Sequence, residues 1–255
     1  MTNRLFISLI LSLLAFADSP LQARQTADHF VDFSPAQKLL RVQVQALAGG
    51  ATITQNYKKV FPAITNQNIN MGNSWGIGAK AIFGIREYLG FGTAANLFIN
   101  NYNIDMAIIG DDRLSMSAAF INNRNFTVNI PVFINFRFNV AKSVAWNIET
   151  GLFYSYGFAG HQKQRIYRAE INSMDEFIPE LESIRTDYYK SPRTLFNSFR
   201  RSDIGIHIGT SLDFGPHLNV GVQSQVGFKN ASISTGVANP SIHNISMHAL
   251  IGYRF

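Results

Sequence analysis

Three residues in the second half of the chain have side chains that could perform acid–base chemistry: Glu149, His207 and Asp213. A histidine near a carboxylate is a candidate general base, and Ser211 would then be the candidate nucleophile. Their spacing argues against this, because six residues of extended strand would separate His207 from Asp213 by about 20 Å. Ser211 is four residues from His207, also beyond hydrogen-bond reach, although Glu149 and His207 fall at similar depth on neighbouring predicted strands and could touch. We therefore expect no catalytic site and no enzyme.

Metal and cofactor chemistry has equally little support in the sequence. The chain contains no cysteine, and His207 and His248 form no pair at the spacing of metal ligands. Inward-facing single histidines are typical of hydrogen-bonded structural groups. We expect no metal and no cofactor.

The segments that must position these side chains alternate strictly between apolar and small or polar residues. In residues 146–160, one face carries Trp146, Leu152 and Phe158, whereas the other carries Asn147 and small residues. Such a period of two is typical of a β-strand. The same pattern predicts eight strands, at residues 40–48, 75–86, 89–99, 126–138, 146–160, 203–214, 218–229 and 245–255.

The connections between these strands favour a membrane barrel. Short turns follow the second, fourth and sixth predicted strands, and long polar loops follow the first, third, fifth and seventh, as in outer-membrane barrels with an even number of strands. Charged residues make up only 15% of the chain, against roughly 25% in soluble domains. A secreted β-sandwich would also alternate, but its outer face would be charged instead of glycine-rich. We predict an all-β fold: an eight-stranded antiparallel up-and-down transmembrane β-barrel, preceded by a cleaved signal peptide.

The N-terminal segment indicates export. Arg4 precedes an apolar run at residues 5–16, and small residues follow, as in a secretory signal peptide. We expect a signal peptide at residues 1–23, with cleavage after Ala17 as the alternative. A periplasmic segment at 24–38 and the barrel at 39–255 would follow. These features place the protein in the outer membrane of a Gram-negative cell, with both termini in the periplasm.

Charged and polar residues on the strand face that carries the small side chains would point into the barrel lumen. An eight-stranded barrel is just wide enough for side chains to fill, and charges there are costly unless they are paired. These inward-facing residues predict a lumenal salt-bridge network. The functional alternative is an anion-selective constriction. Its predicted members are Arg41, Lys80, Arg86, Arg137, Glu149, His207, Asp213, His248 and Arg254.

The connection at residues 161–202 is the most individual feature. It mixes basic residues, acidic residues and aromatics, and loops this long are usually functional or disordered. We expect a long external loop, containing a short helix that Pro179 interrupts, which either lies over the barrel mouth or binds a protein or lipopolysaccharide. The Asn-rich segments NQNINMGN and INNRNF are typical of turns at loop tips.

The net charge of +6 raises the question of a polyanionic partner. The sequence shows no basic stripe with interleaved aromatics, so we expect no nucleic-acid binding. Outer-membrane lipids and lipopolysaccharide are the more natural partners of this charge in an exported protein.

The stretches IPVFINFRFN, WNIETGLFYSYGFAG, DIGIHIGTSLDFGPHLNVGVQSQVGFKN and SMHALIGYRF resemble a Bacteroidetes outer-membrane β-barrel domain family, the PorT-like group of small porin-like barrels. The resemblance is strongest from about residue 126 to the end. It implies an integral outer-membrane protein and, for PorT itself, a link to a secretion and gliding apparatus. The ending, with Tyr253 and Phe255, resembles the terminal assembly signal and implies the barrel-assembly machinery as a partner.

These observations favour a non-enzymatic scaffold or binding protein that acts through its extracellular loops on an envelope or extracellular protein. The alternative is a narrow porin-like channel with a basic lumenal constriction.

Overall fold

The computed structural model describes residues 30–109, 115–171, 177–189, 199–233 and 240–255. The predicted signal peptide, residues 1–23, lies outside the described residues. The elements are β1 (Leu40–Gln55), α2 (Tyr57–Val60), β2 (Ile64–Asn70), β3 (Gly72–Arg86), β4 (Leu89–Ile109), β5 (Ser115–Ala141), β6 (Val144–Ile171), β7 (Phe177–Asp187), β8 (Ser202–Phe214), β9 (Leu218–Gly227) and β10 (Ile242–Arg254). In the described part of the chain, no helix has the length and apolarity that a membrane span requires.

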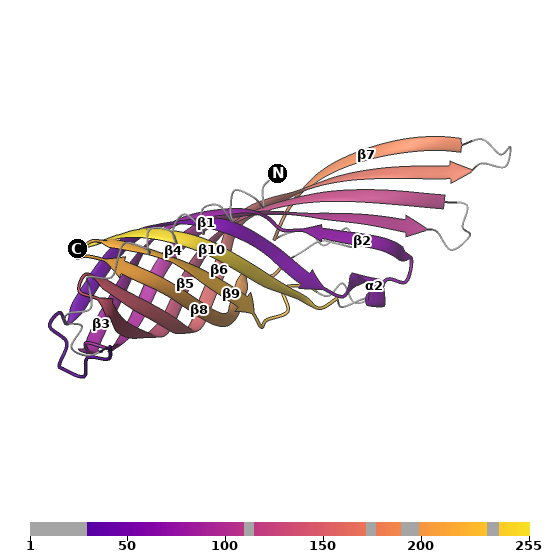
Figure 1. Cartoon of the computed structure of the whole chain (residues 1–255). Helices are drawn as coiled ribbons and strands as arrows, with labels where there is room; N and C mark the ends of the chain where they lie inside the picture. Colours follow the sequence, from indigo (N-terminus) through magenta and orange to yellow (C-terminus); the bar gives the residue numbers. More distant parts are fainter. Residues whose placement is uncertain (1–29, 110–114, 172–176, 190–198, 234–239) are drawn as a thin grey trace.

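Eight of these strands form a closed antiparallel ring. The order is β4-β3-β1-β10-β9-β8-β6-β5, and the pairing of β4 with β5 closes it (Figure 1). Strands of the ring that follow one another in the chain are neighbours in space, apart from the inserted β2 and β7. Closure leaves no open edge in the ring, which is what a membrane requires of β-structure.

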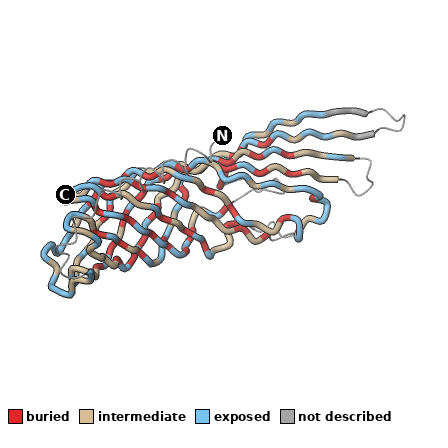
Figure 2. The backbone as a smooth tube through the Cα atoms, in the orientation of Figure 1, coloured by how far each residue is buried: buried red, intermediate tan, exposed pale blue. Residues whose placement is uncertain are grey.

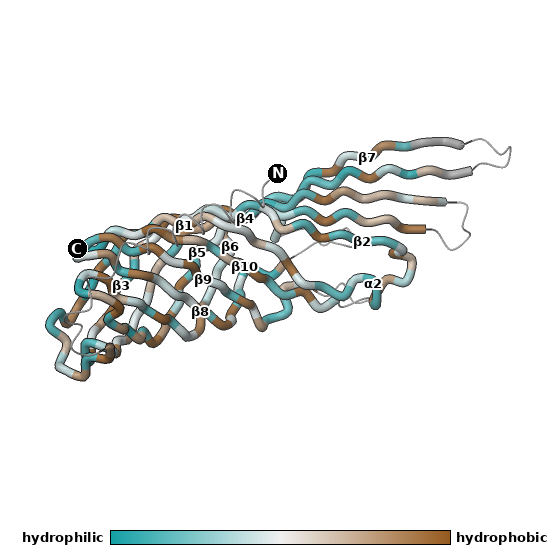
Figure 3. The backbone as a smooth tube through the Cα atoms, viewed as in Figure 1, coloured by the Kyte–Doolittle hydropathy of each residue, from teal (hydrophilic) through white to brown (hydrophobic). Residues whose placement is uncertain are grey.

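The barrel is apolar outside and polar inside. Along β1, Val42 and Val44 are exposed, whereas Gln43 and Gln45 are buried. Figures 2 and 3 show this alternation around the ring, with buried residues interspersed with exposed hydrophobic ones. A soluble protein would bury the opposite face, so the outer surface is built to contact lipid.

The two ends of the barrel differ. At the turn end, residues 87–88, 142–143 and 215–217 make short connections between successive strands. The segment before β1 lies across this end, where Phe30 stacks on Phe138 with ring centroids 5.0 Å apart. The peptide N–H of Glu87 also donates a hydrogen bond to the carbonyl of Ser34 at 3.1 Å.

At the other end, the loop end, strands β4, β5 and β6 continue far beyond the ring (Figure 1). There β2 pairs with the end of β4, and β7 pairs with the end of β6. The resulting sheet, in the order β2-β4-β5-β6-β7, is called the extension below. In Figure 1 it projects from the barrel on the side away from the C-terminus.

The extension corrects two of our expectations. Residues 161–171 and 177–187, expected within a long loop, form a β-hairpin, and Pro179 pairs with Ala169 in strand geometry instead of interrupting a helix. The Asn-rich segments, expected as turns, lie largely in β2 and in β5. Cross-strand pairing satisfies the backbone of both segments, and this pairing overrides the local turn preference of asparagine.

A β-bulge marks the boundary between barrel and extension. The register between β5 and β6 shifts between Phe126 and Thr127, so that Phe126 pairs with Ala159 and Thr127 with Gly157. A bulge inserts one unpaired residue and reverses the alternation of its strand. Beyond Phe158, therefore, the odd-numbered residues of β6 point outward.

One face of the extension covers a hydrophobic cluster at the barrel mouth. This cluster is called the cap below. Helix α2 and the segments after β7 and β9 supply the other side of this cluster. Its buried members are Ile53, Tyr57, Ile64, Tyr102, Ile104, Met106, Ala119, Ile121, Tyr188, Tyr189, Phe199, Ala231 and Ile242.

Candidate functional site: a filled lumen beneath a capped mouth

An ion pair occupies the middle of the lumen. The Nζ of Lys80 on β3 lies 2.7 Å from Oε1 of Glu149 on β6. The Nε2 of His207 on β8 lies 3.6 Å from Oε2 of the same carboxylate, and all three side chains are buried. Glu149 and His207, which the sequence placed at similar depth, are thus brought together by adjacent strands.

Aromatic and amide groups complete this layer. The ring of Phe133 lies under the Lys80 ammonium, 5.7 Å from its centroid, and beside the His207 ring. A Cβ on Gly92 would come within 2.3 Å of the Phe133 ring, so only glycine leaves room for it. The Nε2 of Gln225 donates to Nδ1 of His207 at 3.1 Å, and Gln225 and Asn129 exchange two amide hydrogen bonds of 3.0 Å each.

A second cluster of charges lies toward the turn end. Asp213 accepts a hydrogen bond from Nη1 of Arg254, and Nε of Arg137 lies 3.6 Å from the same carboxylate. Arg137 also reaches Oε2 of Glu87 at 3.3 Å. Arg41 borders a cavity of about 10 Å³ between this cluster and Glu149. The carboxylates of Glu87 and Asp213 therefore face three guanidinium groups, those of Arg41, Arg137 and Arg254. The cluster as a whole carries a net positive charge.

Arg86 and His248, the other two predicted lumenal residues, lie apart from these clusters. The β3–β4 register shifts between Gly84 and Arg86, and Arg86 is exposed at the turn-end rim, 3.4 Å from the carbonyl oxygen of Phe33. His248 is buried nearer the mouth, where its ring stacks on Phe98 and its Nε2 lies 2.7 Å from Oγ of Ser74.

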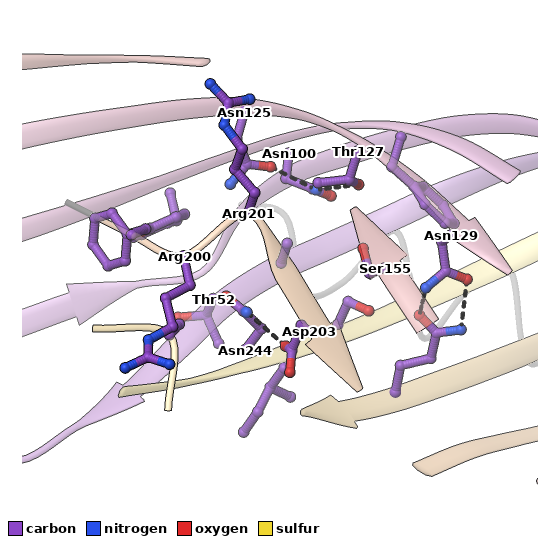
Figure 4. Close-up of a pocket in the computed structure, with 18 of the residues that line it drawn as sticks. Thr52, Asn100, Asn125, Thr127, Asn129, Ser155, Arg200, Arg201, Asp203 and Asn244 are labelled. Atoms are coloured by element: carbon purple, nitrogen blue, oxygen red, sulfur yellow. Dashed lines mark hydrogen bonds between the residues drawn. The ribbon is translucent and has the colours of Figure 1, made fainter. Parts of the chain in front are cut away.

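A cavity with both polar and apolar walls separates the lumenal layer from the cap (Figure 4). It holds about 80 Å³ and is lined by amides such as Asn100, Asn125 and Asn244, together with Asp203. Several of these groups already bond one another, since Asn100 donates to Asn125 at 2.8 Å and Asn244 donates to Asp203 at 2.7 Å. The space suits a few water molecules.

Tyr188 and Tyr189 hold the cap onto the barrel. The hydroxyls of Tyr188 and Tyr102 are hydrogen-bonded at 2.6 Å, and Tyr188 stacks on Phe199 with ring centroids 4.4 Å apart. Tyr189 packs where Gly157 has no side chain, since a Cβ there would meet its hydroxyl at 1.8 Å. Arg201 covers the Tyr189 ring at 4.8 Å and donates to the carbonyl oxygens at 157 and 158.

The residues around Tyr188 and Tyr189 do not by themselves indicate that these tyrosines form a cap. Their positions in a long connection suggested a surface, and Tyr102, the hydrogen-bond partner of Tyr188, precedes it by more than eighty residues. The usable signal was the alternation of Tyr102, Ile104 and Met106 beyond the predicted end of their strand, which marks a second apolar face.

The predicted assembly-signal residues lie at the turn end. Tyr253 and Phe255 are both exposed on the outer surface, and their rings meet edge to face at 5.3 Å. His217 stacks on the other side of Tyr253 at 5.1 Å. No group of three or more potential metal-ligating side chains gathers among the residues that the structure describes.

A closed ring of eight strands with a lipid-facing exterior defines the class of a β-barrel membrane protein. The family model of the outer membrane protein beta-barrel domain matches residues 56–232, more than half of the chain. The chain therefore belongs to this family and is a protein of the outer membrane. No curated protein matches the sequence.

Three of the solved structures to which the chain is similar are the following. OprG from Pseudomonas aeruginosa is 11% identical, with a TM-score of 0.42 over 89% of this chain and 99% of that one. Ail, the attachment invasion locus protein of Yersinia pestis, is 10% identical, with a TM-score of 0.38 over 86% and 100% of the two chains. Neisserial surface protein A is 8% identical, with a TM-score of 0.32 over 86% and 98%.

Proposed function

We propose that the protein is a non-enzymatic scaffold that binds an envelope or extracellular protein through its extension. The observation that supports this most directly is the contrast between a lumen filled with bonded side chains and a sheet that projects beyond the barrel. In outer-membrane barrels, short turns face the periplasm and long connections face the exterior. By this rule the extension is extracellular.

The filled lumen argues against solute passage. The layer of Lys80, Glu149 and His207 spans strands β3, β6 and β8, and Phe133 packs against it. Opening it would separate a buried ion pair, which is strongly unfavourable. The same burial leaves Glu149 and His207 no space for a substrate, because the cavity beside Glu149 holds only about 10 Å³.

The far end of the extension carries an apolar surface suited to a protein partner. On its outer face, Met116, Phe120, Tyr167 and Leu181 are 56%, 39%, 44% and 59% exposed. Phe120 and Tyr167 meet edge to face at 5.8 Å, and Tyr167 pairs directly with Leu181. Aromatic and methionine side chains are enriched in protein interfaces. We name these four residues the tip patch.

Crosslinking tests the scaffold proposal. A photoreactive residue at Leu181 should crosslink to one protein partner in intact cells, and the variant Phe120→Ser/Tyr167→Ser should abolish that adduct. A photoreactive residue at Lys142, exposed at the turn end, is the matched control and should not form it. An adduct that persists in the double variant, or that also forms from Lys142, would contradict a tip-patch partner.

A basic vestibule favours the channel as a second candidate. A cavity of about 220 Å³ opens at the turn end, lined by Lys38, Arg41, Arg86, Arg137 and Arg254. Planar-bilayer recordings of the refolded protein separate the two candidates. The scaffold predicts a silent membrane, whereas a steady anion-selective conductance that falls in Arg137→Gln would favour the channel.

The resemblance of residues 126–255 to PorT-like barrels gives one setting for such a scaffold. A secretion or gliding apparatus is an envelope assembly in which a closed barrel with an extracellular sheet would anchor other components. Deletion of the chromosomal copy, followed by assays of secretion and gliding, tests this setting. The barrel-assembly machinery is a further proposed partner, and Phe255→Ala should slow insertion if the terminal residues act as its signal.

A further inference from the structure

The outer face of the extension continues the lipid-facing surface of the barrel. Even-numbered residues of β5 point outward in both parts, from Ile134 and Ile130 to Arg124 and Phe120. On β6, the bulge near Phe158 brings the odd-numbered residues to that face, where Arg124 pairs with His161 and Phe120 with Arg165. Side chains just past the boundary are therefore placed beside the outer leaflet.

An aromatic pair lies at the boundary between the barrel and the extension. Phe126 and Phe158 are neighbours with ring centroids 6.2 Å apart. Outer-membrane barrels carry girdles of aromatic residues at both membrane interfaces, so we take this pair as the level of the membrane surface. The guanidinium of Arg124 lies over the Phe126 ring, 5.4 Å from its centroid, so the first cation sits directly on this level.

Four exposed cations gather on this face: Arg124, Lys163, Arg165 and Arg185, called the basic patch below. None of them has an ion pair with any residue that the structure describes. Lys163 and Arg185 are direct cross-strand partners, and like charges in that position destabilise a sheet. On the opposite face, by contrast, Arg168 is paired with Glu182 at 3.0 Å. These four cations therefore form a candidate binding site for an external anion.

The two acidic groups near the patch offset its charge only in part, because they are outnumbered by its four cations and form no ion pair with them among the described residues. Asp105 accepts a hydrogen bond from Asn70 at 3.3 Å, and Asp187 accepts one from the peptide N–H of Tyr189 at 2.8 Å. The pKa of the neighbouring His161 reflects the positive potential that remains. Its pKa is lowered by partial burial and then by Arg185, Arg124 and Lys163.

We infer that the basic patch binds the phosphate groups of lipopolysaccharide in the outer leaflet. Guanidinium groups match phosphate oxygens in bidentate geometry, and successive outward residues rise by roughly 7 Å along a strand, within the span of one sugar-phosphate headgroup. The assignment goes beyond the proposed scaffold, because the tip patch lies farther along the strands. Lipid binding would fix the extension relative to the membrane while leaving the tip patch free.

Binding of purified lipid A to the refolded protein in detergent tests the inference. The probes are bisphosphorylated lipid A and the same lipid after removal of its phosphates. The patch variant is Lys163→Gln/Arg165→Gln/Arg185→Gln. The control, Lys58→Gln/Lys59→Gln/Arg168→Gln, removes the same charge at the same end of the molecule but off the patch. Heat-modifiable gel migration verifies that each variant is folded.

The patch variant should bind bisphosphorylated lipid A about 100-fold more weakly than the wild type, given the attraction expected per cation near an anionic surface. The control should remain within about threefold, and the dephosphorylated lipid should bind both proteins weakly. As a second measurement, NMR should show the pKa of His161 rising when lipid A binds. Equal binding by patch variant and control would overturn the inference. So would tighter binding of a soluble sulfated polysaccharide than of lipid A, which would assign the patch to an extracellular polyanion.

Discussion

The barrel and the extension use the same strands, β4, β5 and β6, but they contain opposite chemistry. Inside the barrel, the inward face buries ions and amides such as Lys80, Glu149 and Gln225. In the extension, the corresponding face buries Tyr102, Ile104 and Ile121. The outward faces also differ, since apolar residues surround the barrel, whereas on the extension the cations of the basic patch come first and the apolar tip patch lies beyond them.

The medium around the strands explains the difference. Where lipid surrounds the ring, apolar groups gain nothing from facing inward, and the narrow lumen collects the polar residues. Where water surrounds the extension, apolar groups are stabilised by burial under the cap. Most lumenal charges are therefore paired, whereas the exposed cations of the extension remain available to bind a ligand.

The largest expected effect is the loss of the lumenal ion pair. Glu149→Leu leaves the Lys80 ammonium buried without its carboxylate, and removing one partner of a buried pair costs about 3–5 kcal/mol. Urea unfolding of the refolded protein measures it. The double variant Lys80→Met/Glu149→Leu should recover most of that loss; if it is no more stable than the single variant, the pair is not the cause.

Within the cap, removal of one tyrosine hydroxyl should cause a smaller loss of stability. Tyr188→Phe leaves the buried Tyr102 hydroxyl without the partner at 2.6 Å, at a cost of about 1–3 kcal/mol. Because the cap is local, limited proteolysis of the extension should report the change, while the barrel keeps its gel migration. Tyr102→Phe/Tyr188→Phe, which removes both hydroxyls, should be less affected than the single variant.

Alkaline pH should open the cap before the barrel. Burial, and then the neighbouring Tyr189, raise the pKa of Tyr188 above its ordinary value of 10.0. The folded cap therefore holds the proton more tightly than the unfolded one, and its stability is full below pH 10 and falls as the pH rises further. Protease digestion at pH 11 should cleave the extension and spare the barrel. Simultaneous cleavage of both parts would contradict a cap that opens independently of the barrel.

The smallest effect is expected for the ion pair on the surface of the extension. Arg168 and Glu182 are 3.0 Å apart, with side chains 44% and 39% exposed, and such pairs contribute less than about 1 kcal/mol. Glu182→Gln should leave the urea midpoint almost unchanged. A loss as large as that of Glu149→Leu would mean that exposure does not distinguish the two regions.

The barrel strands were predictable because their signal is local. Alternation such as Gln43 and Gln45 against Val42 and Val44 specifies both a strand and its two faces, and the short turns specify the order of strands. Depth counting on neighbouring strands also indicated that Glu149 and His207 could touch, and their side chains lie 3.6 Å apart. The exposed position of Arg86 was not predictable, because the register shift after Gly84 depends on pairing between strands.

The extension and the cap needed the tertiary structure. Alternation by itself does not say where a strand leaves the membrane, and asparagine-rich segments have a local preference for turns that only pairing overcomes. The cap joins Tyr102 to Tyr188, residues distant in sequence, through a bulge whose position the side-chain pattern does not reveal.

The local patterns of the sequence were therefore enough to predict an eight-stranded membrane barrel with a polar lumen, because each strand carries its own two-faced pattern. The folded structure was needed to show which lumenal charges meet, where the sheet emerges into water and which cations are left without partners. Those outcomes depend on register and on contacts between distant residues, which no local pattern encodes.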